Sequence, residues 1–94
     1  MAFLIPIRRV LDTADVVVYR YEQPIYAQHP SKPGRRVEIG NQFGEIELDK
    51  KSGETEWLAG KDWDVKGIIR DRVCFKLARC WTEGAYPELL HWES

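Results

Sequence analysis

The stretch Phe43–Trp57, "FGEIELDKKSGETEW", constrains the fold of this chain more than any other segment. Apolar and acidic residues alternate on both sides of "KKSG", a pattern typical of two half-buried strands joined by a tight turn. Gly53 gives that turn a residue that adopts a positive φ without strain. The sequence therefore predicts a hairpin with one apolar side and one acidic side.

The acidic side of this hairpin brings like charges together. With the turn at residues 50–53, Asp49 pairs with Glu54, Glu47 pairs with Glu56, and alternation puts the next acid of the strand on the same side. Like charges placed opposite each other on a sheet are destabilising, so folding alone does not explain the arrangement. The five carboxylates of this face are Glu45, Glu47, Asp49, Glu54 and Glu56.

Further strands are predicted on the N-terminal side of the hairpin. Val16–Glu22, "VVVYRYE", is β-branched and aromatic. Phe3–Ile7 is either a short edge strand or, because of Pro6, the entry to a helical turn over Ile7–Leu11. Ala27–Arg36 holds two prolines, a glycine and three cations, which indicates an exposed loop. The tail "AYPELLHWES" carries enough large apolar side chains that we expect it to pack on the domain.

An amphipathic helix is predicted over Ile68–Glu83. Gly84 is its expected stop, and Asp62 or Asp64 is expected to cap its start. The chain length predicts one domain over residues 1–94, with an α+β fold. We expect an antiparallel sheet of three to four strands with this C-terminal-half helix packed on one face and the carboxylates pointing away from it. The apolar stripe of the helix is Ile69, Val73, Leu77 and Cys80.

Composition and motifs limit the chemistry. With 14 Lys and Arg against 15 Asp and Glu, the net charge of -1 does not indicate a nucleic acid or an anionic membrane as partner. His29 and His91 are the only histidines, and no metal-ligand spacing, nucleophile elbow or phosphate loop occurs. We expect no catalysis, no metal or other cofactor, and no membrane association. Cys74 and Cys80 point apart on the helix, so we expect free thiols in the cytoplasm.

Two interpretations of the acidic face stay open. In the first, cations such as Arg20, Lys50 and Lys51 neutralise it, and salt screens the remainder. In the second, it is a docking site for a cationic partner, because a patch of one sign accelerates association. Trp63 is a candidate aromatic anchor, whereas Trp57 fits the core better. The candidate partner-binding residues are Glu45, Glu47, Asp49, Glu54, Glu56 and Trp63.

The order of these motifs resembles the small immunity proteins of bacterial polymorphic-toxin systems, including contact-dependent growth inhibition. The resembling segments are "FLIPIRRVLDTADVVVYRYEQPIY", "FGEIELDKKSGETEWL" and "RVCFKLARCWTEGAYPELLHWES". The resemblance implies a small cytoplasmic protein that binds and neutralises one cognate bacterial toxin domain, commonly a nuclease. The acidic face adds the expectation that the partner is basic and that the hairpin covers its active site. It implies no binding residues by position, so the candidate site rests on the charge pattern alone.

A second hypothesis is a nucleic-acid-binding or regulatory module. Arg72, Lys76 and Arg79 share one face of the predicted helix, Phe75 is available for stacking, and the "KPGRR" loop adds further cations. The lack of net positive charge argues against direct nucleic-acid binding. Exposed Ile68 and Phe75 leave homo-oligomerisation open.

Overall fold

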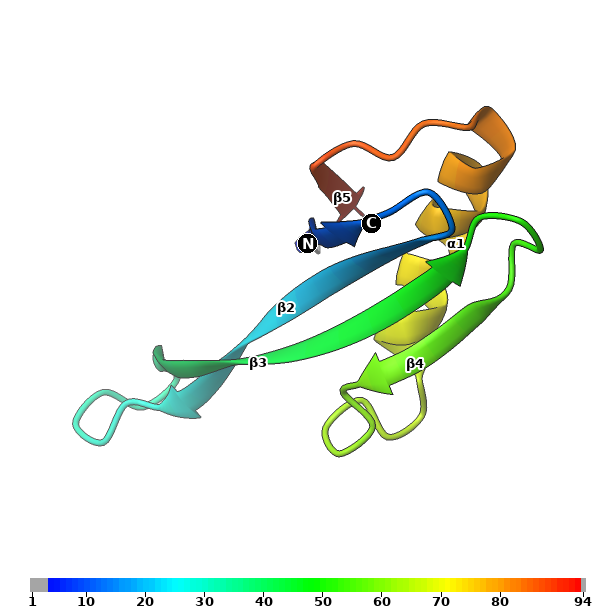
Figure 1. The fold of residues 1–94 in the computed structure, drawn as a ribbon. Helices are drawn as coiled ribbons and strands as arrows, with labels where there is room; N and C mark the ends of the chain where they lie inside the picture. Colours follow the sequence, from blue (N-terminus) through cyan, green and yellow to red (C-terminus); the bar gives the residue numbers. More distant parts are fainter. Residues whose placement is uncertain (1–3, 94) are drawn as a thin grey trace.

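The computed structural model describes residues 4–93 and contains one antiparallel sheet with one helix packed against it (Figure 1). In space the strands follow the order β4-β3-β2-β1-β5. The expected α+β fold, with a helix of the C-terminal half on one face of the sheet, is confirmed. The elements are β1 (Leu4–Asp12), β2 (Val16–Gln28), β3 (Arg36–Asp49), β4 (Thr55–Ala59), α1 (Ile68–Glu83) and β5 (Leu89–Glu93).

The sheet reaches five strands because both ends of the chain join it. β1 is a strand as far as Asp12, so the alternative of a helical turn over residues 7–11 is wrong; residue 3 of the expected strand lies outside the described residues. Pro6 stands just before the β1–β2 pairing, which begins at Ile7, so its missing N–H breaks no bond there. The tail packs on the domain as expected, with Leu90 of β5 opposite Ile7.

β2 and β3 run far past the rest of the sheet. β1 pairs with β2 only as far as Tyr21, and β4 pairs with β3 only as far as Glu45. The segment Glu22–Phe43, named the arm below, is therefore a two-stranded ribbon that projects from the domain (Figure 1). The exposed loop expected at residues 27–36 closes the arm, but it is shorter than expected because the strands continue to residues 28 and 36.

The core lies between α1 and one face of the sheet. Alternation along β2 buries Val17, Tyr19 and Tyr21 on this face, and the apolar side of the predicted hairpin contributes Ile46 and Leu48. The opposite face of the sheet, named the outer face below, carries no helix (Figure 1). The fully buried core side chains are Ile5, Ile7, Val17, Tyr19, Tyr21, Ile46, Leu48, Val73 and Leu77.

The start of α1 is held by Asp64. This carboxylate is almost fully buried, and it accepts hydrogen bonds from the backbone N–H groups of Ile69 at 3.3 Å and Arg70 at 2.8 Å. These are donors that the first turn of a helix cannot satisfy internally. The expected cap is thus Asp64 and not Asp62, and α1 ends as expected at Gly84, which has φ 72°.

Tyr21 and Gly44 lock β2 against β3. The two residues lie directly opposite each other, and a Cβ atom at Gly44 would fall 2.2 Å from Cζ of Tyr21. The absent side chain lets the phenol ring cross β3, where its Oη accepts a hydrogen bond from Nε1 of Trp57 at 3.0 Å. The ring centroid of Trp63 lies 5.7 Å from that of Tyr21.

We expect Gly44→Ala to lower the free energy of unfolding by at least about 2 kcal/mol, because the tyrosine ring has no room to give way. Gly40→Ala on the same strand is the matched control. A Cβ at Gly40 meets nothing within 4 Å, so this change should stay within about 0.5 kcal/mol. Urea unfolding of both variants measures the difference, and equal losses would contradict the packing described.

At alkaline pH, ionisation of the buried side chains of Tyr19 and Tyr21 should unfold the protein. Burial raises the pKa of Tyr21 to about 12 and raises that of Tyr19 as well. Because the unfolded phenols ionise near pH 10, their contribution to stability is complete below pH ~10 and is lost as pH rises toward ~12. Phenolate absorbance and circular dichroism should change together in this window. Ionisation of both phenols with the fold intact would contradict this.

Candidate functional site: the acidic end of the β3–β4 hairpin

The β3–β4 hairpin has the predicted register next to its turn. Glu47 lies opposite Glu56, and the backbone N–H of Asp49 donates to the carbonyl of Glu54 at 2.9 Å. Gly53 has the expected positive φ of 77°. The carboxylates of β3 therefore alternate with the buried apolar residues and lie on the outer face, away from α1.

Two of the five carboxylates are engaged within the molecule. Oε1 of Glu45 accepts two hydrogen bonds from the Arg20 guanidinium, at 3.1 Å from Nε and 2.7 Å from Nη2. The Asp49 carboxylate accepts from the backbone N–H groups of Lys51 at 2.8 Å and Ser52 at 3.2 Å. Glu45 is thus neutralised by an arginine across the strands, and Asp49 orders the turn.

The other three carboxylates have no such partner. Within residues 4–93, the side chains of Glu47, Glu54 and Glu56 form no ion pair and no hydrogen bond. Glu54 and Glu56 are exposed and Glu47 is half-buried. These three residues are named the acidic patch below. Their charge is left for solvent or for another molecule to compensate.

The lysines of the turn point to the β1–β2 connection instead. Nζ of Lys50 lies 2.5 Å from Oδ1 of Asp12 and also donates to the carbonyl of Thr13. This hydrogen bond lowers the pKa of the Asp12 carboxyl. Lys51 forms a longer ion pair with Asp15, at 3.5 Å. The interpretation that internal cations neutralise the acidic face therefore holds for Glu45 alone.

The tryptophans do not join the acidic patch. Nε1 of Trp63 donates to the carbonyl of Phe43 at 2.8 Å, and its ring packs beside Tyr21 on the helix side of the sheet. The Arg70 guanidinium lies over the Trp57 ring, 4.7 Å from its centroid. The structure thus places both indoles in packing positions and separates Trp63 from the carboxylates with which it was grouped.

An aromatic residue that sequence reasoning did not select lies on the outer face. Phe43 is 49% exposed, and the guanidinium of Arg20 lies 4.8 Å from its ring centroid. Phe43 shares its face with Glu45 and Glu47 by simple alternation along β3. The alternation of side chains along β3 was therefore enough to predict that Phe43 lies on the outer face. No local pattern in the sequence predicted where Trp63 lies.

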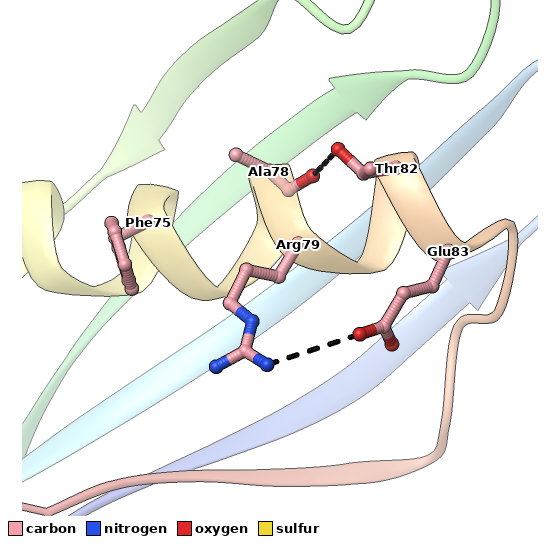
Figure 2. Close-up of a pocket in the computed structure, with 5 residues that line it drawn as sticks. All are labelled: Phe75, Ala78, Arg79, Thr82 and Glu83. Atoms are coloured by element: carbon pink, nitrogen blue, oxygen red, sulfur yellow. Dashed lines mark hydrogen bonds and ion pairs between the residues drawn. The ribbon is translucent and has the colours of Figure 1, made fainter.

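The basic side of α1 carries a depression next to Phe75 and Arg79. Figure 2 shows a depression lined by Phe75, Ala78, Arg79, Thr82 and Glu83, all from the same helix. Nη2 of Arg79 lies 3.9 Å from Oε1 of Glu83, and the Thr82 hydroxyl donates to the Ala78 carbonyl at 3.0 Å. A depression lined by one helix is shallow, and its arginine already has a carboxylate neighbour.

The two halves of the alternative nucleic-acid surface are far apart. The basic loop at residues 29–35 lies at the tip of the arm, whereas α1 packs at the other end of the molecule (Figure 1). On the helix, Arg70 bonds Asp71 at 2.7 Å, and Nζ of Lys76 lies over the Trp92 ring. Loop and helix therefore do not combine into one cationic surface.

Other chemical features are few in the part of the chain that the structure describes. No cluster of three or more His, Cys, Asp or Glu side chains there has the geometry to hold a metal ion. No helix among residues 4–93 is both long and apolar enough to cross a membrane. Cys74 and Cys80 are free thiols, and burial raises the pKa of both, which keeps them in the less nucleophilic thiol form.

No protein-family model, curated protein or solved structure matches this chain. Functional inference therefore rests on the fold and on the placement of charge. Within residues 4–93, the acidic patch beside the β3–β4 turn is a charged feature that the internal contacts of the protein leave unexplained.

The like-charge pair should oppose folding measurably. Glu56→Lys places an opposite charge across from Glu47, and we expect it to raise the free energy of unfolding by about 0.5 kcal/mol. Glu45→Lys makes the same charge change but breaks the pair with Arg20, so stability should fall by a similar amount. Chemical denaturation at low salt measures both variants. A Glu56→Lys variant that is no more stable than the unaltered protein would show that the pair carries no strain.

Proposed function

We propose that this protein is an inhibitor of the immunity type, which binds a cognate bacterial toxin domain in the cytoplasm and covers its basic active site with the acidic patch. The observation that carries the proposal is the pairing of Glu47 with Glu56, and Glu54 beside it, without internal cations. This arrangement costs folding energy. A cationic partner would turn the same charges into a favourable contribution.

The charge of the patch suits rapid capture of a basic protein. A surface of one sign can raise association rates by about 10–10³. Enzymes that act on nucleic acids contact phosphates with lysine and arginine, so a nuclease active site presents the complementary potential. A nuclease toxin is therefore the partner class that this patch fits best, in agreement with the resemblance noted above.

The scaffold behind the patch is rigid, which favours tight binding. Ile46 and Leu48, the residues between the acids of β3, are fully buried against the core. The Asp49 carboxylate orders the turn through two backbone N–H groups. A partner would thus meet carboxylates held on an ordered sheet, which reduces the entropy lost on binding.

Co-purification with the product of the neighbouring gene, which the proposal expects to be the toxin, is the direct test. We expect the pair to co-purify, and E47Q/E54Q/E56Q to weaken binding at least about 30-fold, mainly by slowing association. E22Q/E38Q/D62N is the matched control, because it removes the same charge from exposed positions outside the patch. Equal loss for both triple variants would refute the acidic patch as the interface. Absence of any complex would refute the inhibitor function.

A further inference from the structure

The arm gives the chain more surface than a compact monomer of its size exposes. The accessible surface is 6419 Å², about 800 Å² above the value of about 5,600 Å² that scaling gives for 11.0 kDa. The radius of gyration is 15.1 Å, against about 12 Å for a compact domain of this length. An excess of about 800 Å² equals the area that one subunit contributes to a standard protein interface.

The arm also lacks a core of its own. It is a ribbon of two strands, an arrangement that is marginally stable in water without further contacts. Large apolar side chains along it remain open to solvent: Tyr26 is 51% exposed, Ile39 65% and Phe43 49%. A projecting ribbon with this much exposed apolar surface is typical of an interaction element.

The outer face of the β2–β3 ribbon carries Arg36 near the tip of the arm and the acidic patch at its other end. Gln28 pairs with Arg36 and Tyr26 with Glu38, so alternation puts Tyr26 and Arg36 on the same face as the acidic patch. The Arg36 guanidinium lies 5.9 Å from the centroid of the Tyr26 ring. Phe43 occupies the same face between the two ends.

The charges at the two ends match but cannot meet within one chain. Residues 28–37 contain Lys32, Arg35 and Arg36 and no acid; these three cations are named the basic tip. Arg36 and Glu47 lie about 36 Å apart along β3 at ~3.3 Å per residue, far beyond a Debye length of ~8 Å. The three cations of the basic tip, with Glu38 on the same face two residues from Arg36, thus lie at the opposite end of the ribbon from the three uncompensated carboxylates.

We propose that two copies of the chain pair through their outer faces about a two-fold axis, with the arms antiparallel. The midpoint between Arg36 and Glu47 on β3 lies beside Phe43, which puts this phenyl ring at the axis. The basic tip of each copy then reaches the acidic patch of the other. Such an interface is isologous, since the same surface serves both subunits.

The second copy covers the same carboxylates as the toxin of the proposed function. Binding of a toxin would therefore compete with pairing and release the arm. The dimer does not depend on the toxin, and its test uses the chain alone. Failure of one proposal leaves the other open to its own experiment.

A charge swap tests the pairing. We expect the unaltered protein to sediment as a dimer at low salt, and K32E/R35E/R36E and E47K/E54K/E56K each to weaken self-association at least about tenfold. An equimolar mixture of the two variants should restore dimers, because each reversed tip then meets a patch of opposite sign. A protein that stays monomeric at about 1 mM, or a mixture that associates no better than its components, would overturn the proposal.

A second pair of variants tests the aromatic contact at the axis. Phe43→Ser should weaken the dimer several-fold, whereas Ile68→Ser, at a position 52% exposed on α1, should leave it unchanged. Circular dichroism checks that both variants are folded. A labelled DNA duplex provides the competing outcome: a monomeric chain that binds it through the basic tip would assign the arm to nucleic acid and overturn pairing of the two copies.

Discussion

The register of β2 against β3 is the constraint on which the rest of the structure depends. The side chains of a strand alternate between faces, so a slip of one residue would exchange the buried and exposed sets along the whole ribbon. Tyr21 fixes this register because its ring occupies the space that a Cβ atom of the facing residue would take, and that residue is Gly44. The same alignment that buries Tyr19 against Ile46 turns Glu45 and Glu47 to the outer face.

The outer face combines charges that are paired within the protein with charges that are not. Glu45 meets Arg20 across the strands, so the charge nearest the centre of the sheet is neutralised. Glu47 lies opposite Glu56 of the edge strand β4, whereas the nearby Lys50 forms its ion pair with Asp12. Arg20 and Lys50 thus stabilise the domain without reducing the charge of the acidic patch. The pairing of the internal cations therefore leaves the charge of the acidic patch to solvent or to another molecule.

Local patterns predicted much of this structure, and long-range contacts account for what they missed. The turn at Gly53, the apolar stripe of α1 and the alternation of β3 are each set by neighbours in sequence. The position of Trp63 depends on space left beside Tyr21 by residues distant in the chain, which no periodicity encodes. The length of the arm was not predicted either. Pro24, Pro30 and Pro33 indicated a loop, and the strands of the arm have no buried face whose alternation would indicate a strand.

The arm has features that restrict how another molecule can add to it. Unpaired strand edges recruit other strands indiscriminately unless they are protected. Pro24 lacks a backbone N–H, and the irregular pairing between Ile25 and Tyr26 leaves Ile39 as an extra residue that bends and twists β3. Both features disfavour edge-to-edge pairing along the ribbon. The exposed aromatic residues of the outer face, Tyr26 and Phe43, are therefore the surface on which the proposed pairing of two copies depends.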